Sequence, residues 1–467
     1  INDNFLPILI DRELAPLLDA HLQDVMTQQR GFGGWPANLI LTPDGYPVAS
    51  FSYADPGNLE PALSELLERW QNEPEMLASE GQALLARLAQ EREASERLLR
   101  DTSLADLLQR FLQQANAASD VTYGGFGDNE KYPHLPQLDA LLSLTAVVPD
   151  ASLTSFLGTT LDAMLQNGLR DQLGGGFFRY TTDRQWRMPH YEQMLYTQAL
   201  AVRVLARAGN QLREQRYTDA AEAALKNMLR AFRRSDGLFR SSLSAVGHDG
   251  TDGGHYLWQP GELDALLGRE SRDRIEALVK TPDGILPGLA PDAPEDLRMK
   301  LLQRREQRPP PADDKALLGL NGLVLSALAA MSGNPEARKA GEKLAVALNK
   351  AAENGAPGRL ADRPAAGPAR LDDLVYAGRG LFDWSQTRGD RRAAVNAAAL
   401  LQTAHSRHYD DTRWLQGELA PLPGNSVTLL IQDTQLPSPA ALWICLLYTS
   451  PSPRDPLRYL VCRLLLE

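Results

Sequence analysis

Apolar residues recur with helical spacing over most of the chain. In residues 103–115, five apolar side chains fall at positions i, i+3, i+4, i+7 and i+8, the pattern of an amphipathic helix with one buried face. Thr102 and Ser103 stand before this pattern and are residue types that cap helix N-termini. The same spacing predicts helices at residues 135–144, 155–168, 191–209, 220–232, 322–331, 337–352, 374–387 and 392–404.

The first 75 residues have a different pattern. The apolar run at residues 6–10 predicts a buried strand, and apolar positions at residues 16–26 predict a helix. Two further runs, residues 37–41 and 47–53, have strand character and flank TPDGY, whose Asp-Gly pair favours a hairpin turn. This part of the chain is therefore predicted to be α/β.

Glycine-aromatic loops separate the predicted helices. GGFGDNEKYPH, GGGFFRYTTDRQW, DGLFRSS and GGHYLW repeat one theme between roughly paired helices, which indicates a repeated helix hairpin. Six such hairpins would close into a ring with inner and outer helices. Residues 282–311 are rich in proline and charge and are predicted to form a long irregular connection.

Composition excludes several classes of protein. The 467 residues carry a net charge of −11 and no basic stripe, which argues against a nucleic-acid partner. The sequence contains no apolar run of about 18 residues that could span a bilayer. Cys445 and Cys462 are the only cysteines, too few for a disulfide framework or a zinc site. We predict no cofactor and no metal, and assign no compartment beyond a cytoplasmic default.

The stretch from Asp171 to Tyr196 has the highest density of aromatic, charged and histidine side chains in the chain. Pro189 is a residue type that suits the first turn of a helix, so His190 is predicted to lie at a helix N-terminus, where the dipole favours its neutral form. We predict that this stretch lines an active or binding cavity. Phe177 and Phe178 are expected to point in opposite directions, one into the helix layer and the other toward the mouth of this cavity. The catalytic candidates are His190, Glu192, Asp183 and His134. The substrate-binding candidates are Arg179, Tyr180, Trp186, Tyr191, Phe178, Asp128, Lys131, His255, Asp314 and Lys315.

Each candidate also has a structural interpretation. His190 and Glu192 could cap and bridge neighbouring hairpins, and His134 could cap a helix. His255 lies beside Tyr256 and Trp258, where a lone histidine is often packed in the core. Asp314 and Lys315 precede an apolar segment and have the charge order of a helix start.

Five segments, in this order, resemble the thioredoxin-domain family that includes spermatogenesis-associated protein 20. They are GGWPANLILTPDGYPV, YGGFGDNEKYPHLPQLDALL, LGGGFFRYTTDRQWRMPHYEQMLY, DDKALLGLNGLVLSALA and LDDLVYAGRGLFDW, and the match extends to about Ser426. The resemblance implies a mainly α fold: a thioredoxin-like domain followed by an (α/α)6 barrel of the six-hairpin glycosidase type, similar to N-acylglucosamine 2-epimerases. Its implied domains are residues 1–75, a partial thioredoxin-like domain, and residues 76–444, the barrel.

The chain departs from this family at both ends. The family carries a Cys-His-Trp-Cys-His motif just upstream of the position where the present sequence begins, so a partial thioredoxin-like domain is expected. By resemblance, Pro36 occupies the cis-proline position, and we expect a cis Trp35–Pro36 bond. The run CLLYTSPSPRD resembles translated adapter DNA, so residues 445–467 are predicted to be a non-native tail that does not complete the barrel.

Two classes of function follow from these observations. The first is a carbohydrate-active or carbohydrate-binding barrel with a small-molecule ligand such as a sugar. Proton transfer by His190 with His134 or His255 would give an epimerase or isomerase. Two carboxylates among Asp128, Asp183, Glu192 and Asp314 would instead give a glycoside hydrolase. The second class is a thiol-disulfide redox protein whose barrel is a recognition platform, or a non-catalytic scaffold. In this class the thioredoxin-like domain could take a protein partner.

Overall fold

The computed structural model describes residues 1–100, 104–145, 150–267, 273–290, 293–353, 357–363, 367–409, 414–415, 422–423 and 434–449. The chain divides into two compact units. The smaller one comprises residues 1–112 and 410–429, and the larger one residues 113–409 and 430–467. The predicted fold class, a mainly α protein with an α/β N-terminal part, is confirmed.

The smaller unit contains the predicted helix and hairpin. Val25 and Met26 on the first helix are fully buried, and Val25 packs on leucines of the third. The two strands pair antiparallel, and Trp35–Pro36 is cis, as expected. Its elements are α1 (Pro16–Arg30), β1 (Asn38–Leu41), β2 (Pro47–Phe51), α2 (Pro56–Asn72) and α3 (Pro74–Arg100).

The strand expected at residues 6–10 is absent from the structure. Leu6 is 85% and Leu9 101% exposed, and neither β1 nor β2 pairs with this segment. An apolar run forms a buried strand only where a sheet offers it hydrogen-bond partners and a covered face. The prediction was wrong because the two-stranded sheet of this unit provides neither.

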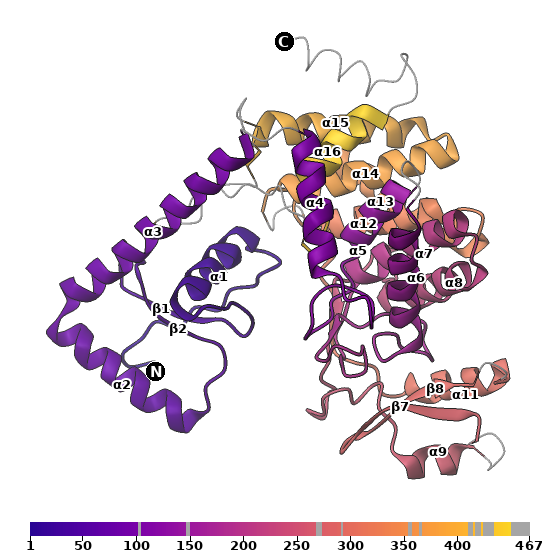
Figure 1. The fold of residues 1–467 in the computed structure, drawn as a ribbon, viewed down its shortest axis with the longest axis horizontal. Coiled ribbons are helices and arrows are strands. Elements are labelled where there is room, and N and C mark those ends of the chain that lie inside the picture. The colour runs from indigo at the N-terminus through magenta and orange to yellow at the C-terminus, as the bar shows by residue number, and fades with distance from the viewer. Residues whose placement is uncertain are drawn as a thin grey trace. The chain divides into compact units, whose positions relative to one another are not determined.

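The larger unit is built from helix hairpins. Helix α12 buries 12 of its 13 residues and α7 buries 13 of its 18, which is typical of helices surrounded by others. Helices α6 and α8 bury one face each and form an outer layer. Figure 1 shows α7, α12 and α14 packed side by side. The hairpins are α5 (Leu135–Thr145) with α6 (Ala151–Gln166), α7 (Leu195–Leu212) with α8 (Gln215–Asn227), α12 (Leu318–Ala330) with α13 (Pro335–Glu353), and α14 (Leu371–Arg388) with α15 (Arg391–His408).

Two glycines let α12 and α14 approach each other closely. A Cβ added to Gly322 would lie 2.3 Å from the Tyr376 carbonyl oxygen, and one added to Gly380 would lie 2.1 Å from the Gly322 carbonyl oxygen. Any side chain at either position would force the two backbones apart. Gly322 and Gly380 are therefore needed for the contact between the two helices. This contact holds both helices in place and so offsets the low helix propensity of glycine.

Residues 282–311 are more regular than expected. An antiparallel hairpin and a helix replace the predicted irregular connection, and Leu301 of the helix is fully buried beside Trp258. Pro287 is tolerated because the pairing shifts between Ala277 and Val279. The elements of this region are α9 (Pro260–Leu266), β7 (Ile275–Thr281), β8 (Gly284–Leu289) and α11 (Glu295–Arg305).

One further helix ends the described part of the chain. Helix α16 (Pro439–Thr449) packs on α14, Trp443 donates its indole N–H to the Leu401 carbonyl oxygen, and Leu446 is fully buried. The helix therefore continues across the predicted boundary at residue 444. The proline-rich residues 451–456 lie outside the described residues. No helix among the described residues is long and apolar enough to cross a membrane.

Candidate functional site

The loops before the inner helices are joined to one another by short backbone pairings. β3 (Tyr180–Thr181) pairs with β4 (Pro189–His190), and Thr181 also pairs with Lys131 of the preceding loop. β5 (Gln193–Met194), β6 (Ser242–Leu243) and β9 (Ala312–Asp313) form a three-stranded sheet. Leu317 pairs with Leu360. These pairings place the loops at one end of α5, α7, α12 and α14, which is the end that carries the candidate residues.

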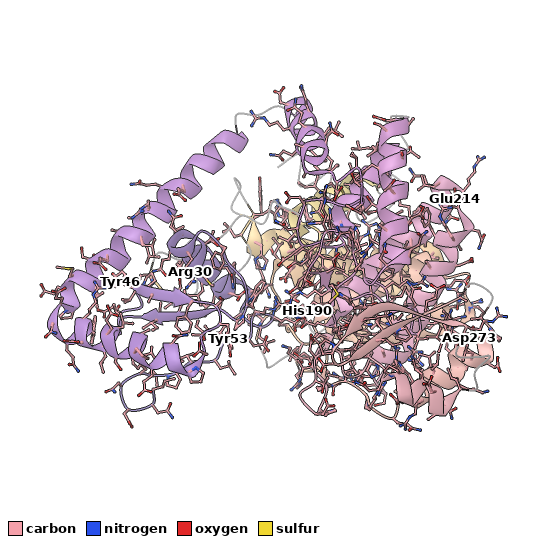
Figure 2. The ribbon with its side chains drawn as sticks, turned by 60° about the horizontal axis from the view of Figure 1, so that its bottom comes forward. Arg30, Tyr46, Tyr53, His190, Glu214 and Asp273 are labelled. Atoms are coloured by element: carbon pink, nitrogen blue, oxygen red, sulfur yellow. The ribbon has the colours of Figure 1, made fainter. Side chains whose placement is uncertain are left out.

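Polar and aromatic side chains from two of these loops and from α7 gather at this end. Figure 2 labels His190, which precedes α7, and Glu214, which follows its far end. These side chains interact with one another through ring stacking, through an ion pair and through longer-range electrostatic interactions of Arg179. We call this group the mouth cluster; its members are Tyr132, Arg179, Tyr180, His190, Glu192 and Tyr196.

Three rings of the mouth cluster form a stack. Tyr132 and Tyr180 are parallel with centroids 4.7 Å apart, and Tyr180 and His190 are parallel at 5.0 Å. The antiparallel pairing of Tyr180 with His190 sets the second contact, because directly opposed residues on one face of a β pair lie close together. His134 meets the far end of the stack edge-on, 6.2 Å from Tyr132. The two histidines are thus separated by two tyrosine rings.

An ion pair lies beside this stack. Arg179 donates from Nη1 to Oε2 of Glu192 over 2.9 Å, and its backbone N–H donates to the Glu192 carbonyl oxygen. The two side chains are 14% and 23% exposed, so each keeps a face toward solvent. Burial, together with nearby Glu130, raises the pKa of Tyr132 to about 12, so its phenol stays protonated and able to donate.

His190 occupies a short strand rather than the first turn of a helix. The prediction from Pro189 was wrong because Gln193 and Met194 pair with β6, so α7 begins only at Leu195. Partial burial lowers the pKa of His190, which keeps the imidazole neutral near pH 7. Its Nδ1 is buried and has no hydrogen-bond partner among the residues that the structure describes. A neutral imidazole with an unused ring nitrogen is able to accept a proton.

Lys131 is not available to a ligand. Its side chain is fully buried, and its ammonium group donates to Asp120 Oδ2 over 2.9 Å and to the Gly127 carbonyl oxygen over 2.5 Å. Arg184 donates to the same carboxylate from two nitrogens, at 2.7 and 3.1 Å. The expectation of substrate binding by Lys131 is therefore corrected: the lysine ties the first loop to the second.

Asp183 and Trp186 are also structural. The Asp183 carboxylate accepts the backbone N–H groups of Gln185, Arg187 and Met188, which closes the turn between β3 and β4. Trp186 is fully buried at a φ of 65° and donates its indole N–H to the Tyr123 carbonyl oxygen. The ring is enclosed, so it offers no surface for stacking a sugar.

The two phenylalanines do not alternate between core and cavity. Phe177 and Phe178 are both fully buried, and Phe178 packs edge-on against Tyr191 and Tyr256. Tyr191 is 4% exposed. The expectation that Phe178 and Tyr191 bind a ligand is corrected, because both rings belong to the core beneath the loops.

His255 belongs to the same packed region. Its Nδ1 lies 2.8 Å from the Arg308 carbonyl oxygen, and because a carbonyl can only accept, Nδ1 carries the hydrogen. Its ring meets Tyr256 edge-on at 4.6 Å. Burial and the charge of Arg305 lower the pKa of His255 to about 4.

Acid is expected to destabilise the fold through His255. Its ordinary pKa is 6.5, so as pH falls below that value the unfolded chain binds a proton that the folded chain refuses until about pH 4. Between pH 7 and pH 4.5 this group should remove about 2–3 kcal/mol from the free energy of unfolding. Urea unfolding of His255→Gln should show a correspondingly weaker pH dependence, and identical slopes for both proteins would contradict this prediction.

The remaining candidates are not members of the mouth cluster, although His134 touches it through Tyr132. Asp128 is exposed on its turn, and Asp314 is exposed and pairs with Arg240. Lys315 pairs with Asp313 at 2.8 Å. His134 is part-buried between aromatic rings, and burial lowers its pKa. The carboxylates proposed for glycoside hydrolysis are thus dispersed: Asp183 closes a turn, Glu192 binds Arg179, and Asp128 and Asp314 face solvent.

Sequence reasoning missed three residues at this end of the helices. Tyr132 and Tyr196 belong to the mouth cluster, and the Tyr196 hydroxyl is 3.0 Å from Gln435 Oε1. Residues 434–437 also contact Gln137 of α5 and Tyr376 of α14. Tyr132 directly precedes a Pro-His pair in GGFGDNEKYPH, so the sequence motif could have identified it as a candidate. Only the fold could have brought the distant Gln435 there. Within the described part of the chain, no group of three side chains is placed to hold a metal ion.

The fold and site define a helix-hairpin protein with a polar-aromatic cluster at the N-terminal ends of its inner helices. Comparison with known proteins agrees with the resemblance predicted from sequence. Residues 1–89 match the family described as "Protein of unknown function, DUF255". Spermatogenesis-associated protein 20 of Rattus norvegicus is 32% identical over 286 residues, which cover 57% of this chain and 36% of the rat protein. The Homo sapiens protein is 31% identical over the same shares.

The resemblance to the family that includes spermatogenesis-associated protein 20 is thus confirmed, although the chain spans only about a third of the length of these curated relatives. Among solved structures, a sugar epimerase from a ruminal bacterium aligns with a TM-score of 0.46 and 11% identity, over 66% of this chain and 71% of that one. A D-mannose isomerase aligns with a TM-score of 0.45 and 12% identity, over 70% and 76%.

Proposed function

We propose that the larger unit binds a sugar, or a related polyhydroxy carbonyl compound, at the mouth cluster and isomerises or epimerises it by proton transfer through His190. The observation that carries this proposal is the neutral imidazole of His190, which is stacked on Tyr180 and lies beside the Arg179–Glu192 pair. Phenols and a guanidinium are the donors that hydroxyl and carbonyl oxygens require.

The residues divide the chemistry as follows. The imidazole of His190 takes the proton from the carbon next to the substrate carbonyl, and the C–H electron pair moves into an enediolate. Arg179 stabilises the negative charge on the enediolate oxygen, as fixed cations do where charge develops. The protonated His190 then returns the proton to either carbon. Return to the neighbouring carbon, together with transfer of the hydroxyl proton from the oxygen that becomes the new carbonyl to the former carbonyl oxygen, gives the isomer. Return to the original carbon from the other face requires a second acid.

The positions of the histidines favour a single histidine over a pair. Two stacked tyrosine rings stand between His190 and His134, and His255 is engaged by the Arg308 carbonyl oxygen outside the mouth cluster. One imidazole that removes and returns the same proton is enough for aldose–ketose isomerisation. Glu192 holds Arg179 in place, so it acts as a positioning residue in this scheme.

Replacing His190 tests the proposal directly. In D₂O, wild-type protein is expected to exchange the carbon-bound proton next to the carbonyl of an aldose or ketose, followed by NMR. His190→Gln should slow this exchange by about 10²–10⁴-fold, the usual contribution of a general base. The matched control is His134→Asn, because asparagine tolerates the positive φ of 45° at this position. It should exchange at nearly the wild-type rate.

Two results would overturn the proposal. One is the absence of any exchange or binding by the wild-type protein across free aldoses, ketoses and their N-acetyl derivatives. The other is an equal loss in the two variants. The thiol-redox and scaffold alternatives would then be the remaining predictions.

A further inference from the structure

A cavity on the outer side of the helix layer has a charge opposite to that of the molecule. It has a volume of about 500 Å³ and lies between the end of α8, the π-helix η1 (Met228–Phe232), the following turn and the first half of α13. Its lining holds one carboxylate, Glu336. We call the cavity the basic groove; its six cationic side chains are Lys226, Arg230, Arg233, Arg234, Lys339 and Lys343.

Two rows of these cations face the groove from separate elements. Lys339 and Lys343 are four residues apart on α13, and Lys226 and Arg230 are four apart on the α8–η1 helix, so each pair shares one helix face. The turn that supplies Arg233 lies against α13, since a Cβ on Gly237 would be 3.4 Å from Lys343 Cβ. The rows are therefore held in a fixed arrangement by packed backbone.

Most of this charge is not neutralised within the described residues. Arg234 is paired with Asp236 at 2.6 Å and with Asp362 at 2.8 Å. Arg230 forms a long ion pair with Glu306 at 3.9 Å, donates to Asn227 Oδ1 over 3.2 Å and interacts with the charge of Asp171. The other four cations, which form no ion pair among the residues that the structure describes, are Lys226, Arg233, Lys339 and Lys343. In a chain with a net charge of −11, this local excess of positive charge requires a counter-charge from a ligand or from solvent ions.

We propose that the basic groove binds a compact small-molecule polyanion, a compound with two or more linked phosphate groups. Phosphate oxygens accept hydrogen bonds from lysine as a point charge and from arginine as a planar fork, and both types line the groove. Linked phosphates would contact both rows at once. The cavity volume is that of small-molecule sites, and the π-helix that forms one wall is a feature found frequently at functional sites.

The size of the groove favours a small ligand over a nucleic acid. A long polyanion needs a basic track that continues along the surface, and its binding is opposed by a strongly acidic remainder of the protein. The proposal concerns a site separate from the mouth cluster, so it stands or falls independently of the proposed isomerisation.

Calorimetric titration of the whole chain with inorganic tripolyphosphate at low salt tests the assignment. We expect saturable binding that weakens as salt is added, because the contacts are electrostatic. Lys339→Gln should weaken it by about tenfold, the effect of losing one charge-assisted hydrogen bond. The matched control is Lys350→Gln, since Lys350 is an exposed lysine on the same helix outside the groove. It should change the affinity by less than about twofold.

Three outcomes would overturn the proposal. Wild-type protein could show no saturable binding of tripolyphosphate, or only a weak response that inorganic phosphate and sulfate reproduce. The two lysine variants could lose affinity equally, which would indicate non-specific attraction to the helix. An acidic peptide could bind more tightly than tripolyphosphate and lose affinity in Lys339→Gln, which would make the groove a protein-docking surface. His190→Gln should leave tripolyphosphate binding unchanged.

Discussion

Replacing Asp171 with alanine is expected to lower the free energy of unfolding by about 3–5 kcal/mol, which is enough to unfold many domains of ordinary stability. The Asp171 carboxylate accepts two parallel hydrogen bonds from Arg305, at 2.9 and 2.8 Å, and the two side chains are 1% and 3% exposed. Burial opposes the charged form of Asp171, but Arg305 outweighs it and lowers the pKa. Alanine would leave the Arg305 guanidinium buried without its counter-charge.

An exposed pair provides the matched control. Arg392 and Glu353 also form a short ion pair, at 2.5 Å, but their side chains are 59% and 41% exposed. Glu353→Ala is therefore expected to reduce the free energy of unfolding far less than Asp171→Ala does, because solvent screens an exposed pair. Urea unfolding measures both variants under the same conditions.

A double variant separates two costs: leaving the Arg305 charge buried without a partner, and losing the attraction between Asp171 and Arg305. With Asp171→Leu and Arg305→Met together, neither charge remains buried, so the protein should be more stable than Asp171→Ala alone. If Asp171→Ala loses no more unfolding free energy than Glu353→Ala, the Asp171–Arg305 pair does not stabilise the contact between the loop of Asp171 and helix α11.

The buried pair also changes the interpretation of the three glycines in the opening of this loop. Glycines in such a loop can let the backbone approach a ligand closely. A Cβ on Gly174 would lie 2.3 Å from Asp171 Oδ2, and one on Gly176 would lie 2.1 Å from Asn227 Nδ2. Both glycines make room for protein groups rather than for a ligand. The partners, Arg305 and Asn227, lie far along the chain, so no local pattern could have identified them.

Helix periodicity predicted the larger part of the fold, because a helix that buries one face must have apolar residues at intervals of three or four along the sequence. The two-stranded hairpin around TPDGY was equally readable, since its turn is local. The segment at residues 6–10 and the hairpin of β7 and β8 were predicted wrongly. In both, strand formation depends on which distant backbone is available for pairing, and the sequence alone does not specify that.

The candidate site was predictable in location more than in detail. The two glycine-aromatic loops do meet, and four of the nominated residues, Arg179, Tyr180, His190 and Glu192, belong to the mouth cluster. Residue type could not separate these from Lys131, Trp186 and Phe178, which are buried. A loop that must bury its own charges and aromatic rings has the same composition as one that presents them to a ligand.

Asp120→Ala is the second substitution expected to have a large effect, again about 3–5 kcal/mol of unfolding free energy at pH 7. The Asp120 side chain, 2% exposed, accepts from Lys131, from Arg184 and from the backbone N–H groups of Thr122 and Tyr123. The fully buried Lys131 would keep only the Gly127 carbonyl oxygen as a partner. Asp128→Ala, in the same loop but exposed, should change stability by no more than about 0.5 kcal/mol.

The effect of Asp120 should also depend on pH in a defined direction. Burial raises the pKa of this carboxyl, but the hydrogen bonds from Arg184 and Lys131 outweigh burial and hold the pKa below its ordinary value of 3.8. Its stabilising contribution is therefore complete above that value and declines as pH falls below it, because the unfolded chain is protonated first. The difference in unfolding free energy between wild type and Asp120→Asn should shrink between about pH 4 and pH 2. A difference that stays constant over this range would show that the carboxylate charge is not what holds Lys131 and Arg184 in place.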